Sequence, residues 1–109
     1  MEATTTRNVY SLYGRTVTVT ARTWFDRRPG NTYHTVKVWV DGHHVGTSPM
    51  TYGYGYHYQQ TAAEILIDHG YILDDLYRLS RQSRERGFGL VIDHVEVTRK
   101  RDLHAPEPT

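Results

Sequence analysis

The chain has 109 residues, a formal net charge of +1 and no cysteine, and 38% of its residues are hydrophobic against 23% charged. This length and balance are typical of a single globular domain and argue against intrinsic disorder. The lack of cysteine excludes disulfides, thiolate metal ligands and a cysteine nucleophile, and the small net charge argues against indiscriminate electrostatic binding of nucleic acid.

Nothing in the sequence points to a membrane or to secretion. No apolar run approaches the roughly 20 residues of a membrane helix, and residues 1–6 have neither a basic start nor an apolar stretch. We therefore expect a cytoplasmic protein with one domain over residues 1–109, an ordered core at about 7–101 and a loose tail at 102–109.

The first half of the chain alternates apolar and polar residues, which is typical of half-buried strands. Asp41-Gly42 predicts a two-residue hairpin, because a type I′ turn needs a positive φ at both positions. Val9 and Leu12 indicate an additional edge strand within residues 7–13. The other strands expected in this half cover residues 15–25, 33–40 and 43–47.

Two helices and one more strand are expected in the second half. Thr61-Ala62-Ala63-Glu64 matches a capping box, which predicts a helix from Thr61 that ends at Gly70. A second helix is expected from about Leu73 to Arg86, ended by Gly87. The final strand is expected over residues 90–98.

A bulge is expected within this final strand, at Asp93-His94. Val95 and Val97 are out of phase with Leu90 and Ile92 along it, and an extra residue in the ladder would restore the phase.

The order of these elements predicts an α+β fold, with an antiparallel sheet of about four strands and two helices on one face (β-β-β-α-α-β). The helices are expected to cover the valine-rich face of the sheet. The residues expected to meet there are Val17, Val19, Val36, Val38, Ile65, Leu66, Leu76 and Leu79.

The opposite sheet face would combine aromatic rings with cations, at Arg22, Trp24, Tyr33, Lys37 and Trp39. Rings that stack on bases and cations that follow phosphates are what single-stranded nucleic acid needs. The alternative is that both tryptophans form a second small core, covered by the N-terminal segment or by another subunit. Arg27-Arg28 at a hairpin tip would either contact phosphate or form a solvated turn.

A tyrosine segment, Tyr52-Gly53-Tyr54-Gly55-Tyr56-His57-Tyr58, places a ring at every second position. In an extended backbone this spacing puts all four rings on one face. Three interpretations stay open: a base-stacking or protein-binding strip, an extra edge strand, or a structural lead-in whose rings pack on the first helix.

The chain has seven histidines, but a zinc site needs three or four converging ligands. His34 is in phase with the valines, which indicates a hydrogen-bonded core histidine. Asp93 beside His94 would act as an acid/base pair only within a cleft, and the sequence has no nucleophile, phosphate-loop or dinucleotide motif. We therefore expect no catalytic residue, no metal site and no cofactor.

The stretch Val36-x-Val38-x-Val40-Asp41-Gly42, followed by Gly46 and Thr61-Ala62-Ala63-Glu64, resembles the second half of a double-stranded-RNA-binding domain over about 30 residues. That family has three strands and then a helix that opens with lysines and alanines. Its first helix is missing here, and Tyr58-Gln59-Gln60 replaces its lysine cluster. The resemblance therefore does not imply phosphate clamping at this helix start.

A closer resemblance is to small uncharacterised proteins of phages and mobile elements, over about 40 of the 109 residues. It is carried by Asn31-Thr32-Tyr33-His34, Asp41-Gly42, Tyr52-Gly53-Tyr54-Gly55 and Thr61-Ala62. The resemblance implies a viral or plasmid context and a host cytosol, and it brings no established activity.

These features predict a small non-enzymatic binding protein of phage or mobile-element type. The leading hypothesis is binding of single-stranded or irregular nucleic acid through an aromatic and basic sheet face. The alternative is a protein-interaction module, either a homodimer or an inhibitor of a host protein. The residues expected to bind nucleic acid or partner are Arg22, Trp24, Arg27, Arg28, Tyr33, Lys37, Trp39, Tyr52, Tyr54 and Tyr56.

Overall fold

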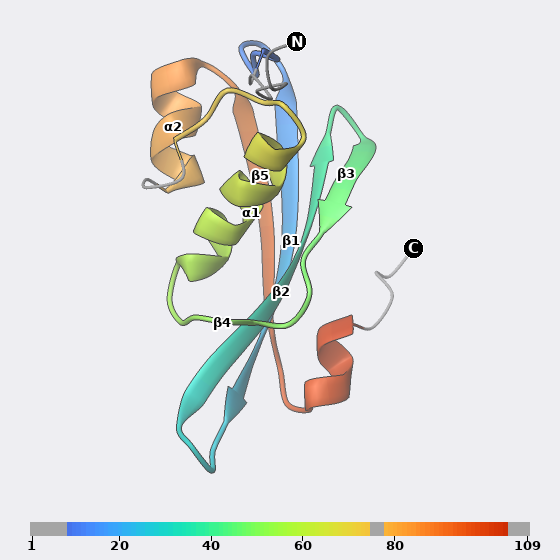
Figure 1. Cartoon of the computed structure of the whole chain (residues 1–109), viewed down its shortest axis with the longest axis vertical. Helices are drawn as coiled ribbons and strands as arrows, with labels where there is room; N and C mark the ends of the chain where they lie inside the picture. Colours follow the sequence, from blue (N-terminus) through green and yellow to red (C-terminus); the bar gives the residue numbers. More distant parts are fainter. Residues whose placement is uncertain (1–8, 75–77, 105–109) are drawn as a thin grey trace, which may run out of the picture.

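The computed structural model describes residues 9–74 and 78–104 and shows an α+β fold (Figure 1). Its elements, in chain order, are β1 (Thr16–Asp26), β2 (Asn31–Val40), β3 (His43–Thr47), β4 (Thr51–Tyr52), α1 (His57–Asp68), α2 (Leu79–Arg86), β5 (Gly89–Val97) and the 3-10 helix η1 (Lys100–His104).

The five strands form one mixed sheet in the order β3-β2-β1-β5, with β4 paired to β2. β2 pairs antiparallel with β1, β3 and β4, but β5 runs parallel to β1. The expected antiparallel sheet of about four strands is therefore wrong in the direction of its last strand. The helices carry the chain back along the sheet before β5 begins, and parallel strands need such a crossover. The alternation of apolar and polar residues is the same whether a strand runs parallel or antiparallel to its neighbour, so the sequence did not indicate the direction of β5.

The predicted Asp41-Gly42 hairpin is confirmed, since Asp41 has φ 51° and Gly42 has φ 83°. The Asp41 carboxylate accepts hydrogen bonds from the Thr16 backbone N–H at 2.9 Å and from Arg15 Nε at 2.8 Å. These two bonds, the Thr16 bond first, lower the pKa of Asp41, and the bond to Asp41 raises the pKa of Arg15. The turn is thereby tied to the start of β1.

Both helices pack on the valine-rich face, as predicted (Figure 1). Leu66 of α1 and Leu79 of α2 are fully buried against it. Full burial of such a side chain contributes roughly 1.5–3 kcal/mol, so this face forms the core. Leu76, also expected there, lies outside the described residues. The valines of β1 and β2 with 0% exposure are Val17, Val19, Val36 and Val38.

The helix boundaries differ from the prediction at their starts and agree at their ends. α1 begins at His57, four residues before Thr61, so the capping-box assignment is wrong. α2 begins at Leu79, whereas Leu73 is not helical and residues 75–77 lie outside the described residues. Gly87 ends α2 in the left-handed conformation, as predicted.

The bulge predicted at Asp93-His94 is not formed, because β5 keeps one register with β1 along its length. Val95 lies opposite Arg22 and Val97 opposite Trp24. These valines are out of phase with Leu90 and Ile92 because they belong to the other sheet face, not because a residue is inserted.

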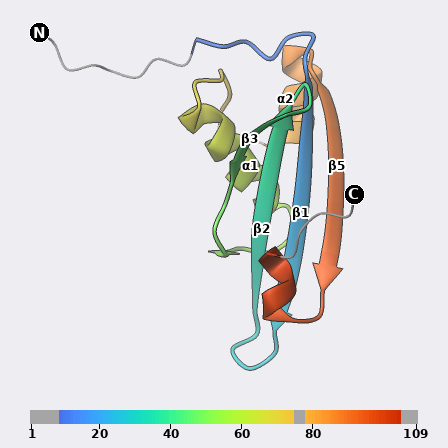
Figure 2. The same ribbon diagram turned by 90° about the vertical axis from the view of Figure 1, so that its right-hand side faces the viewer.

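The C-terminal segment is structured further than expected, because η1 occupies residues 100–104 and Leu103 is buried. η1 packs on the sheet face away from α1 and α2, in front of the lower half of β1 and β2 (Figure 2). The rest of the expected tail, 105–109, lies outside the described residues.

The expected edge strand at 7–13 is not formed over its described part, 9–13. Tyr10 makes only an isolated bridge to Tyr71, while Leu12 joins the core. Within the described part of the chain, no helix is long and apolar enough to cross a membrane.

Candidate functional site

Three aromatic rings line up across the outer face of the sheet, the face that α1 and α2 do not cover. Trp24 pairs with Tyr33 across β1 and β2, and Tyr33 pairs with Tyr52 of β4. The Trp24 and Tyr33 rings stack with centroids 5.9 Å apart, and Tyr52 meets Tyr33 edge-on at 5.8 Å. We call Trp24, Tyr33 and Tyr52 the ring row. Trp24 and Tyr33 are half-buried, and Tyr52 is 56% exposed.

Trp39 lies on the same sheet face, as the sequence predicted, but it does not belong to this row. It pairs with Thr18 and packs edge-on against His44 at 5.5 Å. Thr18 lies six residues along β1 from Trp24, which corresponds to about 20 Å at the rise of a strand. The predicted Trp24 and Trp39 surface is therefore two separate aromatic clusters.

η1 covers the face between these clusters. The Leu103 side chain is buried, and its carbonyl accepts a hydrogen bond from Thr35 Oγ1 at 2.5 Å. Arg22 Nη1 donates to the Asp102 carbonyl at 2.9 Å. The middle of the outer face is thus covered by the chain's own C-terminal 3-10 helix, a cover that the sequence did not suggest.

Arg22 and Lys37, both predicted to bind, lie beneath this cover. They line a cavity of about 120 Å³ between the sheet and η1, together with Thr20, Thr35 and Leu103. Thr20 Oγ1 is buried there and has no hydrogen-bond partner among the described residues. Both cations therefore lie beneath η1 rather than on the open surface. Arg22 holds η1 by its hydrogen bond to the Asp102 carbonyl, and Lys37 lines the cavity under it.

η1 brings a basic cluster to the outer face that the sequence analysis missed. Arg99, Lys100, Arg101 and His104 line an open hollow of about 880 Å³ together with Met50. Arg99 Nε also pairs with Asp102 Oδ2 at 3.2 Å, and an exposed pair of this kind contributes at most about 1 kcal/mol. The basic run was visible in the sequence, but its place beside the sheet depends on burial of Leu103.

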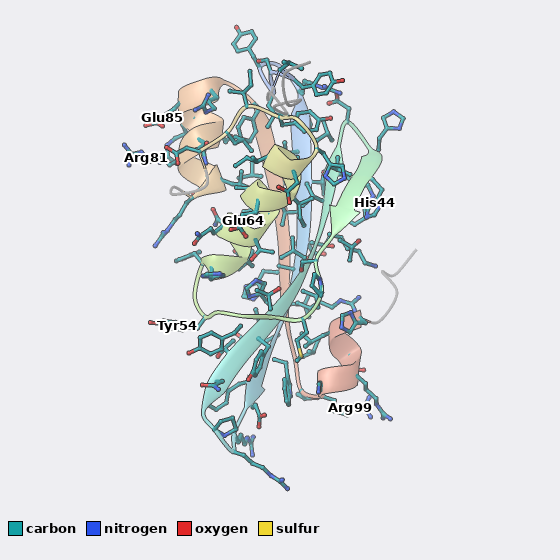
Figure 3. The ribbon with its side chains drawn as sticks, viewed as in Figure 1. His44, Tyr54, Glu64, Arg81, Glu85 and Arg99 are labelled. Atoms are coloured by element: carbon teal, nitrogen blue, oxygen red, sulfur yellow. The ribbon has the colours of Figure 1, made fainter. Side chains whose placement is uncertain are left out.

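The tyrosine segment does not place its four rings on one face. Only Thr51–Tyr52 is extended, Gly53 has φ +153°, and a helix begins at His57. Tyr54 is 74% exposed and extends from the loop between β4 and α1 (Figure 3). Gly53 and the helix break the two-residue alternation, so the rings separate.

The last two rings of the segment are tied to the body of the protein. The Arg78 guanidinium lies 3.9 Å from the centroid of the Tyr56 ring. Tyr58 is 5% exposed and stacks on His94, with centroids 4.9 Å apart. Gln59 is also buried, so this helix start does not present the phosphate clamp of a double-stranded-RNA-binding domain.

His34 anchors the segment from the core and is hydrogen-bonded, as predicted. Its Nδ1 lies 3.3 Å from the Gly53 carbonyl and its Nε2 lies 2.7 Å from Thr61 Oγ1. A carbonyl only accepts, so Nδ1 donates and Nε2 accepts from the threonine. Burial lowers the pKa of His34. A neutral imidazole therefore fixes the backbone between Tyr52 and Tyr54.

A second surface lies at the free end of the β1–β2 hairpin and is here called the tip groove. It has a volume of about 940 Å³ and is open to solvent. It brings together four of the predicted residues, Trp24, Arg27, Arg28 and Tyr54, with Phe25 and Glu96, which were not predicted. Its other lining residues are Thr23, Asp26, Thr32, Gly55, His94, Val97 and Thr98.

The described residues do not gather a metal site, since no group of three or more histidines, aspartates or glutamates among them could hold an ion. His94 Nε2 is hydrogen-bonded to Thr23 Oγ1 at 3.0 Å. Asp93 precedes it in a regular strand and points to the opposite face. The two side chains are therefore not juxtaposed as an acid/base pair.

No protein-family model matches the chain, and no curated protein or solved structure matches it either. The resemblance to phage and mobile-element proteins therefore stays a prediction.

Proposed function

We propose that this protein binds single-stranded nucleic acid across the outer face, between the ring row and the basic cluster of η1. The observation that carries the proposal is the proximity of the ring row and the basic cluster on one face. Arg22 lies two residues before Trp24 on β1, on the same face, and holds η1 by its hydrogen bond to the Asp102 carbonyl. Neither feature alone distinguishes a binding site from an ordinary surface.

The ring row supplies the stacking platform. Tyr52 is the most exposed of its rings, and it is held by strand pairing with Tyr33 rather than by a loop alone. A base stacked on an aromatic side chain contributes roughly 1–3 kcal/mol with little dependence on sequence. A fixed ring loses little side-chain entropy when it binds.

The basic cluster supplies phosphate contacts. Lys100 and Arg101 are exposed on η1. Each phosphate that is neutralised on a single strand adds about −0.7 to the slope of log K against log salt. The small net charge of the whole chain does not oppose this, because the cations are concentrated on η1 and at Arg27-Arg28 of the hairpin tip.

The test is fluorescence polarisation with labelled single- and double-stranded oligonucleotides at several salt concentrations. We expect Tyr52→Ala to weaken single-strand binding about 5- to 150-fold, which corresponds to the loss of one stacked base. The double variant Lys100→Ala/Arg101→Ala is expected to reduce the salt slope by about 1.4. Tyr13→Ala and Arg84→Ala, at exposed positions outside the face, serve as matched controls. Absence of binding to any strand type at low salt would refute the proposal.

A second candidate function, a protein-interaction module, is favoured by the edge of β5. Among the described strands β5 has one neighbour, β1, and its Val91 and Val95 are 53% and 47% exposed. An uncovered edge strand of nine residues is a template for strand addition by a partner or by a second copy. Mass in solution tests the homodimer, and a Val95→Lys variant that separates the copies would support it.

A further inference from the structure

We propose that the tip groove receives one unstacked nucleobase of a bound strand, and that Glu96 selects bases that present an amino group. The inference rests on the proposed single-strand binding and adds a second contact site to it, with a base preference. The groove includes Tyr54, a residue of the tyrosine segment that does not belong to the ring row.

The groove offers exposed rings for a base to stack on. Tyr54 is 74% exposed and Phe25 is 54% exposed, although Phe25 lies on the sheet face that α1 and α2 bury elsewhere. The helices do not extend as far as the hairpin tip, so this end of the inner face is open (Figure 1). The tip groove has a volume of about 940 Å³, which falls in the range of small-ligand sites, roughly 300–1,000 Å³.

Glu96 gives the groove its chemical selectivity. It lies on β5 opposite Thr23, is exposed, and lines the groove. An ionised carboxylate only accepts hydrogen bonds. It therefore suits the N4 amino group of cytosine, and likewise the amino groups of guanine and adenine. Thymine and uracil have no amino group, and their only donor, the N3–H, lies between two carbonyl oxygens that repel a carboxylate.

The hairpin tip supplies the phosphate contacts for this nucleotide. Arg27 and Arg28 line the groove, and the Arg28 backbone N–H donates to Asp26 Oδ1 at 3.2 Å. A second bond closes the turn, from the Gly30 N–H to the Asp26 carbonyl at 2.9 Å. The backbone that carries the two arginines is thus held in a hydrogen-bonded turn.

The groove is continuous with the outer face at Trp24. β5 ends at Val97, which pairs with Trp24, so Phe25 and Asp26 have no strand neighbour on that side among the described residues. Trp24 belongs to the ring row and also lines the groove. A strand bound on the outer face therefore reaches the groove around the free edge of β1.

The experiment compares binding of dC12 and dT12 by fluorescence polarisation at one salt concentration. We expect the wild type to bind dC12 about 5-fold or more tightly than dT12. Glu96→Gln is expected to bring this ratio close to one, because a neutral amide both donates and accepts. Tyr54→Ala should weaken binding of both oligonucleotides. Glu64→Gln makes the same change at an exposed position of α1 outside the groove and should leave the ratio unchanged.

A second measurement separates failure of the groove from failure of the proposed function. Cytidine and uridine 5′-monophosphate are titrated separately, and NMR shifts of Phe25 and Tyr54 are followed. Larger shifts with the cytidine nucleotide, reduced by Glu96→Gln, would support the groove even without oligonucleotide binding. Oligonucleotide binding with equal dC12 and dT12 affinities, unaffected by Glu96→Gln and Tyr54→Ala, would overturn the groove and leave the outer face standing. Absence of any nucleotide shift at Phe25 and Tyr54 would also overturn it.

Discussion

The buried hydrogen bond between His34 and Thr61 provides a sharp test of the structure. Thr61→Val keeps the shape and the β-branch of the side chain and removes only the hydroxyl. The two residues are 1% and 5% exposed, and the bond is 2.7 Å long. Loss of a partner from a buried polar atom costs roughly 1–3 kcal/mol. We expect Thr61→Val to lower the free energy of unfolding by about 2 kcal/mol.

The chain contains a matched control for this variant. His44 Nε2 and Thr47 Oγ1 form the same type of bond at 2.9 Å, but the pair is exposed, so water can replace the lost partner. Thr47→Val is therefore expected to change the free energy of unfolding by less than about 0.5 kcal/mol. Urea unfolding followed by circular dichroism measures both, and with a typical slope of 1–3 kcal/mol per molar the expected difference is about 1 M in midpoint.

Two results would contradict the assignment of Thr61 to the core. The first is an equal cost for Thr61→Val and Thr47→Val. The second is tolerance of Thr61→Asp, because aspartate is a good N-cap residue, whereas the structure requires it to bury an additional carboxylate. Since His34 also binds the Gly53 carbonyl, Thr61→Val is expected to loosen Tyr52 and Tyr54 and to weaken oligonucleotide binding.

Three further predictions follow from burial, backbone conformation and charge. Burial lowers the pKa of His34 from its ordinary 6.5, so the unfolded chain protonates at a higher pH than the folded protein. The contribution of His34 to stability is therefore present above about pH 6.5 and is lost as the pH falls towards the folded pKa. Urea midpoints at pH 7.5 and 5.5 should differ less in His34→Leu than in the wild type. Gly53→Ala should destabilise the protein more than Gly55→Ala in thermal unfolding. Both glycines have positive φ, but only a Cβ at Gly53 would meet the His57 side chain, at 2.6 Å. An equal loss of stability would contradict the contact between Gly53 and His57. Leu103→Ala should cost about 2–5 kcal/mol if η1 is part of the cooperative fold, and it should also weaken the salt dependence of oligonucleotide binding; unchanged stability in urea would show that η1 does not depend on this side chain.

The patterns that the sequence predicted correctly are local. Alternation identified β1 and β2, the turn preference of Asp41-Gly42 predicted the hairpin and the short strand β3 after it, and Gly87 marked the end of a helix. Each depends on steric preferences within a few residues. The burial of the valine face and of His34 was also predictable, because the side chains of a strand alternate between two faces.

The sequence misled where a local signal competed with a distant contact. Thr61 has the sequence context of an N-cap, but its hydroxyl is used by His34, 27 residues away, and the helix extends back to His57. The tyrosine spacing suggested a strand, but Gly53 and the start of α1 separate the rings onto different surfaces.

The amino-acid sequence by itself therefore determined the four longer strands, the Asp41-Gly42 turn and which face of the sheet is apolar, because these depend on neighbouring residues and on the period of the side chains. Only the tertiary structure decided the parallel direction of β5, the cover of η1 over the outer face, and the meeting of Tyr54, Phe25 and Glu96 in one groove. Each of these brings together segments far apart in the chain. Burial of Leu103 is one example: it sets the place of the basic cluster, and no pattern within residues 99–104 specifies the surface that buries it.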